Sequence, residues 1–307
     1  MDDLPLPLAP EAPTDDDELD VWLEDRSLAL GAVLGEAVVN IVVDTTNAYL
    51  DTLTAAGDFA VFDEIPQRWN ATVQSAVLTD INGVFLSGSV NAFVLNPLAG
   101  DIPAATVQSW LGVVNTESLD YLTTASNRLV GIGDDVWGEI RSKVSDTVAS
   151  GATRDQLRRE IQQIANVNAR RAETIARTEI NAAYLNGQRV ASEALGPEFG
   201  PLEKKWRATM DDRTRDSHIT LDDVVVPYDE FFYTINGEYL IGPHDPNGAA
   251  KEVVNCRCRQ IDLYAGDRRP DGTIVGTDAL SDEARAWRDV EDRTDLPFYD
   301  PWANYSG

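Results

Sequence analysis

The sequence predicts an α+β protein with a mainly helical N-terminal domain, a long connecting helix and a small C-terminal α+β module. Three patterns lead to this prediction. Apolar residues recur at three- and four-residue steps through much of the first 150 positions, which is typical of helices with one buried face. A second long helical pattern follows residue 153. Beyond Pro201 it gives way to short runs of strand-forming residues separated by turns.

These changes of pattern divide the chain into five predicted parts. They are a disordered acidic arm at 1–18, a helical domain at 19–150, a connecting helical segment at 151–197, an α+β module at 198–265 and an acidic C-terminal tail at 266–307. The arm has four prolines and ends in a run of acids, a composition typical of disordered termini. In the tail we expect one short helix, near 281–290.

Within the helical domain we expect four helices. The first spans 20–57 without a proline, the second and third begin at Pro66 and Pro103, and the fourth spans about 134–148. Proline suits the first turn of a helix because its missing N–H has no partner there anyway.

The connecting helix has recognisable ends. Thr153 and Gln156 have the spacing of a capping box, and Gly196-Pro197 is a typical stop. In the module, we expect strands at 205–210, 224–226, 239–241 and 260–264, with a hairpin turn at Asn236-Gly237.

The charge balance is strongly acidic, with 52 Asp and Glu against 25 Lys and Arg and a formal net charge of −27. Disordered chains can be this charged, but they lack the seven Trp, nine Tyr and eight Phe found here. A folded, acidic chain with so few lysines indicates a host cytoplasm of very high salt, where repulsion is screened within about 3 Å at 1 M. The same charge excludes strong general affinity for DNA.

Cysteine usage and the chain's first residues indicate an intracellular, non-membrane protein. Two cysteines, at 256 and 258, are too few and too close for a disulfide framework, which favours a reducing compartment. The acidic, proline-rich start does not resemble a signal peptide. The most apolar run, 28–43, is shorter than the roughly 20 residues of a membrane span and contains Glu36 and Asn40, so we expect no membrane partner.

Both histidines and both cysteines of the chain fall within 41 residues, as His218, His244, Cys256 and Cys258. Two imidazoles and two thiolates form a standard tetrahedral zinc set, so zinc is the cofactor that this cluster suggests. The Cys-x-Cys spacing differs from that of common zinc fingers. The alternative is that the cysteines are small buried apolar residues and the histidines are ordinary hydrogen-bonded or loop residues.

Two further groups of residues could carry chemistry. In the segment 211–218, Asp212 and His218 could form an acid/base pair, but a structural network in which Asp212 and Arg213 tie loops together is favoured. Asp212 or Thr214 is the expected N-cap of a short helix there. The arginines of the connecting helix, among them Arg170, Arg171 and Arg177, could contact phosphates. Because the surrounding charge is negative, we expect them to contact protein instead.

An ordered set of motifs resembles the Mu F-like head morphogenesis domain found in minor head proteins of tailed phages and tailed archaeal viruses. The resemblance covers roughly 153–264. It rests on Ile175-Ala-Arg177-Thr178-Glu179, Asn186, Trp206, Thr209, Asp212-Arg213-Thr214-Arg215, Ser217-His218, Leu221-Asp222, Phe231 or Phe232, Pro243-His244-Asp245-Pro246 and Asn255-Cys256-Arg257-Cys258. Many members have Gly where this chain has Asp223, and a small residue where it has His244.

This resemblance implies a structural protein of the virion. We expect a minor head protein that acts in head morphogenesis at the portal or in the head interior, present in host cytoplasm during assembly. Its expected partners are the portal and other capsid proteins, with weak contact to viral DNA and some aid to DNA packaging or delivery. The alternative is a metal-dependent enzyme acting on nucleic acid or another polymer, using His218 and Asp212. A toxin-like transferase is a third class, for which the chain has no recognisable nucleotide-binding loop.

One geometric expectation concerns the Cys-x-Cys segment. In an extended stretch Cys256 and Cys258 face the same side, so both can meet His218 with or without a metal ion. We therefore expect 255–258 to lie beside 211–218, and the strand that follows to pair with the strand carrying Trp206.

Overall fold

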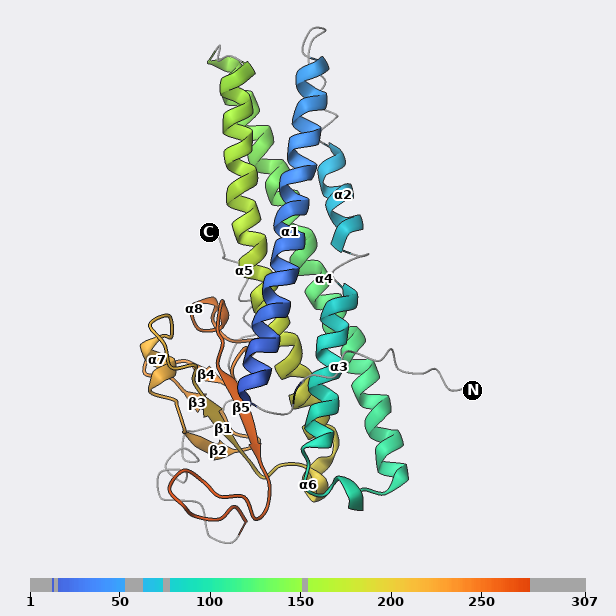
Figure 1. The fold of residues 1–307 in the computed structure, drawn as a ribbon, viewed down its shortest axis with the longest axis vertical. Coiled ribbons are helices and arrows are strands. Elements are labelled where there is room, and N and C mark those ends of the chain that lie inside the picture. Colours follow the sequence, from blue (N-terminus) through green and yellow to red (C-terminus); the bar gives the residue numbers. More distant parts are fainter. Residues whose placement is uncertain (1–12, 14–15, 53–62, 74–77, 151–153, 277–307) are drawn as a thin grey trace. The chain divides into compact units, whose positions relative to one another are not determined.

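A computed structural model describes residues 13, 16–52, 63–73, 78–150 and 154–276. It confirms the predicted fold class, helices first and a small α+β module after them (Figure 1). Most of the predicted arm, Thr153 and the tail beyond 276 with its expected helix lie outside the described residues. Residues 16–18, assigned to the arm from sequence, instead begin the first helix.

Among the described residues, five longer helices and one short 3-10 turn lie before residue 195. They are α1 Asp16–Thr52, α2 Glu64–Thr72, α3 Leu78–Val94, η4 Ala99–Asp101, α4 Ala104–Ala149 and α5 Arg154–Ala194. Two predicted helices, one after Pro103 and one from 134, are a single helix, α4, which no proline interrupts. The helix expected from Pro66 lies in the region of α2 and α3, and residues 74–77 between them lie outside the described residues.

The contacts of the described residues fall into two compact units. The helical unit contains 16–83 and 119–180, and the mixed unit contains 84–118 and 181–276. Helices α3, α4 and α5 each contribute residues to both. The predicted domain boundaries at 150 and 197 remain predictions.

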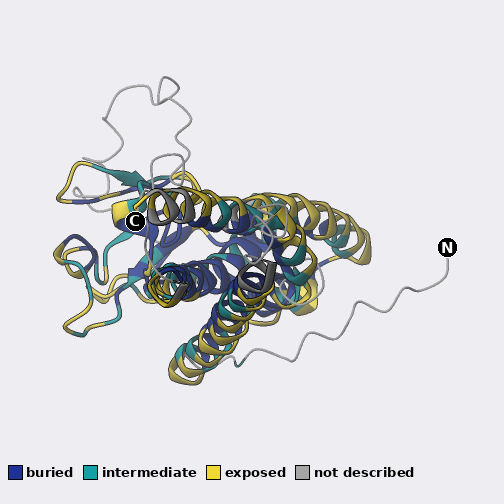
Figure 2. Cartoon of the chain, turned by 90° about the horizontal axis from the view of Figure 1, so that it is seen from above, coloured by how far each residue is buried: buried dark blue, intermediate teal, exposed yellow. Residues whose placement is uncertain are grey.

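In the helical unit, one face of α1 supplies a row of buried apolar residues, Leu23, Leu30, Leu34, Val38 and Val42. Figure 2 shows buried residues on the inner sides of the helices and exposed residues on the outer sides. The indole Nε1 of Trp69 on α2 donates a 2.6 Å hydrogen bond to the carbonyl of Leu129 on α4. This bond satisfies the polar atom of a large side chain that is otherwise fully buried.

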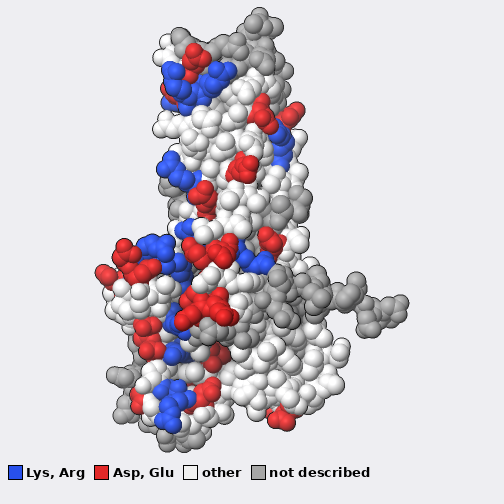
Figure 3. All heavy atoms as spheres, in the orientation of Figure 1, with Lys and Arg blue, Asp and Glu red and all other residues white. Residues whose placement is uncertain are grey.

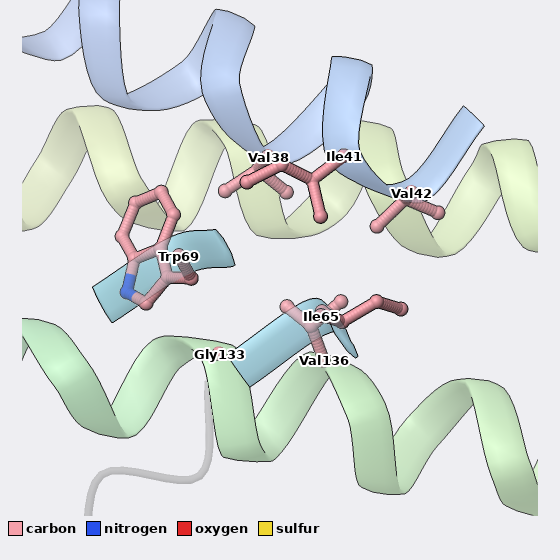
Figure 4. A pocket seen from close by; sticks show the side chains of 7 residues that line it. All are labelled: Val38, Ile41, Val42, Ile65, Trp69, Gly133 and Val136. Atoms are coloured by element: carbon pink, nitrogen blue, oxygen red, sulfur yellow. The ribbon is translucent and has the colours of Figure 1, made fainter. Parts of the chain in front are cut away.

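A small pocket in this unit is lined by apolar residues of three helices, as Figure 4 shows. The lining residues are Val38, Ile41 and Val42 of α1, Ile65 and Trp69 of α2, and Gly133 and Val136 of α4. None of these side chains can bind a metal ion or transfer a proton. We therefore read the pocket as a packing feature of the bundle.

By length and composition alone, residues 17–48 of α1 could cross a membrane. The apolar run considered in the sequence analysis, 28–43, is shorter than this stretch because it was ended at a polar residue on each side. A core helix passes the same test, and 44% of the most apolar window is buried within the protein. The absence of a membrane partner remains a prediction.

In the mixed unit, α3 and α5 cross at very short range. A Cβ atom added to Gly88 would lie 2.1 Å from the carbonyl oxygen of Tyr184, and one added to Gly187 would lie 2.0 Å from that of Phe85. The hydroxyl of Ser89 donates a hydrogen bond to the carbonyl of Gly187 at 3.0 Å. Glycine is required at both positions because the two backbones are in direct contact.

The strands of the module form a three-stranded antiparallel sheet of order β2-β1-β5 and a separate hairpin, β3-β4. The strands are β1 Glu203–Arg207, β2 Val225–Pro227, β3 Phe232–Tyr233, β4 Tyr239–Leu240 and β5 Arg259–Leu263, and the short helices are α6 Gly196–Phe199, α7 Asp216–Ile219 and α8 Ala250–Val253. Trp206 pairs with Gln260, as expected for the last strand. The predicted hairpin turn is also confirmed, with Gly237 at φ 84° between paired Tyr233 and Tyr239.

A buried polar network joins α5 to the sheet. Lys204 on β1 is 1% exposed, and its ammonium donates a 2.7 Å hydrogen bond to the carbonyl of Ile241. Ser192 on α5 donates to the carboxylate of Asp262 on β5 at 2.6 Å. Burial lowers the pKa of Lys204 to about 8, against the raising effect of Asp262.

An ion pair links the chain beyond β5 to the sheet. Arg269 donates two hydrogen bonds to the Glu203 carboxylate, at 2.6 and 2.7 Å, and both side chains are largely buried. The segment that carries it folds back on itself, with a bridge between Arg268 and Ile274. The ordered module therefore continues past the predicted boundary at 265.

We predict that Gly88→Ala lowers the free energy of unfolding by about 3 kcal/mol or more, because the added methyl group forces two backbones apart. The matched control is Gly112→Ala on α4, where a Cβ meets nothing within 4 Å. There the helix propensity of alanine should stabilise by about 0.5–1 kcal/mol. Denaturant unfolding of both variants checks this, and equal effects would contradict the close crossing.

We predict that the free energy of unfolding rises with pH above about 8. The folded protein disfavours charged Lys204, so between pH 8 and 10.5 the unfolded chain binds more protons and raising the pH favours the folded state. Asp262, Asp245, Glu193 and Arg189 surround this group, but carboxylates and guanidinium do not titrate in that window. Lys204→Met should abolish the rise, and Lys205→Met on the opposite face of β1 should keep it. A pH-independent wild-type stability would refute the prediction.

Candidate metal centre

His218 is placed in the core by α7, a single helical turn. Residues 211–214 form a turn of their own, with the amide of Thr214 donating to the carbonyl of Asp211 at 3.1 Å. The helix therefore begins later than predicted, and its N-cap is Arg215 rather than Asp212 or Thr214. As a result Ser217 and His218 point into the module and are buried.

One ring nitrogen of His218 faces both cysteines. Its Nδ1 lies 3.5 Å from the sulfur of Cys256 and 3.4 Å from that of Cys258. The three potential ligand atoms all lie within 4.8 Å of one another, and all three residues are buried. The expectation that the Cys-x-Cys segment lies beside 211–218 is thus confirmed.

The path of the chain brings the two cysteines to the same side. After α8, Asn255 adopts a left-handed conformation with φ 56°, which asparagine tolerates better than most residues. The chain then runs extended into β5, with Cys256 and Cys258 in one core cluster beside Trp206, Leu221 and Phe232. Both cysteines are free thiols.

The two thiols differ in how easily they ionise. Hydrogen bonding from Cys256 is the largest effect on Cys258 and lowers its pKa. Burial raises the pKa of Cys256.

The other ring nitrogen of His218 is held by Glu252 of α8. His218 Nε2 lies 3.1 Å from Glu252 Oε2, which also accepts a 2.8 Å hydrogen bond from the hydroxyl of Ser217. Asn236 donates to the other carboxylate oxygen at 2.7 Å. Burial opposes ionisation of Glu252, but the hydrogen bonds from Asn236 and Ser217 hold its pKa below the usual value. In the neutral ring, Nε2 carries the proton and donates a hydrogen bond to the ionised Glu252 carboxylate. The lone pair of Nδ1 is then directed at the sulfurs.

His244 lies outside this three-residue group. It is 3% exposed, adopts φ 56°, and neither ring nitrogen meets a partner with hydrogen-bond geometry among the described residues. Burial lowers its pKa to about 3, partly offset by the nearby backbone of Cys256. The imidazole is therefore neutral. Three of the four predicted metal ligands converge in the structure, and His244 is buried near them.

A second network lies around the cluster and differs from the predicted one. Asp211, not Asp212, is its acidic member, because Arg257 donates two hydrogen bonds to the Asp211 carboxylate. This pairing lowers the pKa of Asp211. Arg213 also reaches Asp211, whereas Asp212 is exposed. Thr214 and Thr209 continue the network, donating to the carbonyls of Thr209 and Arg257 respectively.

The motif residues of α5 have contacts within the helical unit. Thr178 donates to the carbonyl of Thr174 one turn earlier, and buried Glu179 accepts a 3.3 Å hydrogen bond from the hydroxyl of Tyr121. Arg171 pairs with Asp135 of α4 at 2.8 Å. Arg177 and these neighbours thus lie on a helix that packs against α4, and the role predicted for them from the motif remains a prediction.

Glu252 and Asp211 are the residues that sequence reasoning missed. Glu252 lies in a four-residue helix and belongs to no motif used above. The acidic pair at 211–212 was noticed, but adjacent identical residues give no sign of which one faces inward. The Cys/His count was the signal that located the site.

Comparisons with known proteins place the same region in a family. Residues 138–261 match the family model described as "Phage Mu protein F like protein". This range ends inside β5 and includes His218, His244 and both cysteines. No solved structure matches the chain significantly.

Curated proteins with similar sequences have different names. The chain is 27% identical over 128 residues to "Minor head protein GP7" of Bacillus phage SPP1, covering 42% of this chain and 41% of that protein. It is 30% identical over 179 residues to "NAD(+)--arginine ADP-ribosyltransferase EFV" of Enterococcus faecalis, covering 58% of this chain and 33% of that protein. A third relative, an uncharacterized protein of Haemophilus influenzae, is 26% identical over 150 residues, 48% of this chain and 29% of that protein.

The chain thus spans between about a third and two-fifths of the relatives it matches. The region matched by the family model contains the His and Cys residues on which the resemblance seen in the sequence rests. Over residues 138–261 the chain is thus similar to the Mu F-like head morphogenesis family.

Proposed function

We propose that this protein is a minor head protein that acts in head morphogenesis of a tailed virus. The observation that carries the proposal is the Mu F-like match over 138–261, together with the relative named as a minor head protein. In this proposal the protein assembles with the portal and other capsid proteins, in the head interior or at the portal vertex. It enters the virion in few copies.

The polar residues of the Mu F-like region favour a structural role. Arg257 donates a hydrogen bond to Asp211, and His218 is hydrogen-bonded to Glu252. Both pairs therefore join segments of the same fold. The competing enzyme hypothesis needs His218 and Asp212 in one open cleft. His218 is 1% exposed and Asp212 is at the surface, which disfavours that arrangement. The transferase name belongs to a protein of which the match covers only a third.

Contact with viral DNA is weak in this proposal. Arg171 is engaged by Asp135 within the protein. On the face drawn in Figure 3, blue basic and red acidic side chains are interspersed, without a broad basic surface among the described residues of that face. A net charge of −27 repels a polyanion. The arginines of α5 then serve protein contacts, and any aid to DNA packaging or delivery acts through the assembled head.

From the acidic composition we also propose that the virus infects a host with a salt-rich cytoplasm. The first 150 residues alone have 24 acids and five bases. At molar salt their mutual repulsion acts over about 3 Å, whereas at 0.1 M it acts over about 10 Å. Surface carboxylates also preserve solubility.

We predict that the protein is present in purified virions at low abundance. Quantitative mass spectrometry should find it with a small copy number relative to the major capsid protein. Cross-linking or density at one vertex should place it beside the portal. Its absence from virions, when infected cells contain it, would reject the minor head assignment.

We predict that the melting temperature falls when KCl is reduced from molar concentration to about 0.1 M, because carboxylate repulsion is then less screened. NaCl at equal ionic strength should behave like KCl, since screening depends on ionic strength. A melting temperature that stays constant or rises on dilution would contradict the halophilic interpretation.

A further inference from the structure

We propose that His218, Cys256 and Cys258 bind one zinc ion, with His244 as the fourth ligand. The ion would fix the loops of the Mu F-like region from within. The proposal is independent of the protein's role in the virion.

The spacing of the three converging atoms fits a tetrahedral zinc ion. Zinc binds cysteine sulfur at about 2.3 Å and histidine nitrogen at about 2.0 Å, so tetrahedral angles place sulfur and nitrogen ligands about 3.5 Å apart. In the structure the two such distances are 3.5 and 3.4 Å. Both sulfurs are therefore already near the positions that one shared ion requires.

Hydrogen bonds can join the atoms of this cluster only in pairs. Nε2 of His218 carries the ring proton and donates it in a hydrogen bond to Glu252, so Nδ1 has a single lone pair. Two sulfurs face that lone pair. Only one thiol at a time can donate to that lone pair. A metal ion at the centre would instead bind all three atoms at once.

Glu252 supplies the outer contact that a zinc-bound histidine normally has. Ligating histidines almost always donate the second ring N–H to a carboxylate or carbonyl, which fixes the ring and its tautomer. Glu252 is itself held by Ser217 and Asn236, so the carboxylate is firmly placed. Such a supporting network has little purpose around an ordinary buried histidine.

His244 is the best candidate for the fourth ligand. A neutral, buried imidazole with two unpartnered nitrogens is unfavourable, since an unsatisfied buried polar group costs about 1–3 kcal/mol. Its left-handed backbone adds further strain. In this proposal the side chain of His244 turns toward the ion, and ligation satisfies one of its nitrogens.

The site would be structural rather than catalytic. All four residues are buried, and a closed set of four protein ligands leaves no position for a substrate. The sheet is small, and the strands β2, β3 and β4 have only two or three residues each. A metal ion is a common means of stabilising so small a core.

The first experiment measures the metal in the full chain, purified in molar KCl. After dialysis we expect one zinc per chain by elemental mass spectrometry. A strong chelator should lower the melting temperature, and Zn²⁺ but not Mg²⁺ should restore it. Less than about 0.1 zinc per chain, with no shift on adding Zn²⁺, would overturn the proposal without bearing on the virion assignment.

The second experiment uses variants and Co²⁺ as a spectroscopic substitute. Cys258→Ser should abolish stoichiometric binding. Val226→Ala, a truncation in the same core cluster, should destabilise the module and keep one ion per chain. Glu252→Gln should keep one ion but weaken its affinity by about 10–100-fold. Unchanged binding in Cys258→Ser would refute the site.

The third experiment tests His244 separately. Wild-type protein with Co²⁺ should show the intense visible bands of a tetrahedral site with two sulfur and two nitrogen ligands. His244→Ala should change these bands and weaken binding by more than Glu252→Gln does. An unchanged spectrum and affinity in His244→Ala would overturn the assignment of the fourth ligand.

Discussion

The imidazole ring of His218 connects its own short helix to the segment 252–258, which lies far along the chain. It contacts Cys256 and Cys258 through one nitrogen and Glu252 through the other, across sequence separations of 34 to 40 residues. Its ring also packs edge-on against Trp206 of β1, with centroids 5.0 Å apart, and Trp206 in turn packs against Phe232. The positions of α7, α8, β1 and the start of β5 thus all depend on one side chain, which is why the region has an ordered core despite its short strands.

The sequence was sufficient for features that follow from local pattern. The pairing of the Trp206 strand with the last strand and the hairpin at Asn236-Gly237 could be predicted, because alternation and turn chemistry act over a few residues. The approach of Cys256 and Cys258 to His218 followed from the geometry of an extended chain. The continuity of α4 was missed because breaks in apolar periodicity were taken for helix ends, whereas packing of a long helix tolerates them.

The remainder of the site depends on tertiary contacts that no local pattern encodes. Glu252 was invisible in the sequence since its partners Ser217 and His218 lie more than 30 residues away. Asp211 and Asp212 are chemically identical, and only the folded turn decides which one meets Arg257. The two departures from the family pattern, Asp223 and His244, both have left-handed backbones, at φ 62° and 56°. A left-handed backbone favours glycine, which gives a conformational reason for the glycine that the resemblance implies at position 223. In this chain Asp223 gains an ion pair with Lys205 at 3.0 Å.

The pairing of Glu203 with Arg269 extends the folded region beyond the last residue of the family match. The family match stops at 261, within β5, whereas the counter-ion of a glutamate buried in β1 is eight residues further on. A chain shortened at 261 would lose both the end of its last strand and that guanidinium, which would leave Glu203 as an uncompensated buried charge, a loss that typically costs about 3–5 kcal/mol. The smallest autonomous version of the module therefore extends at least to the turn that contains Arg269, and Val275, which is buried, belongs with it.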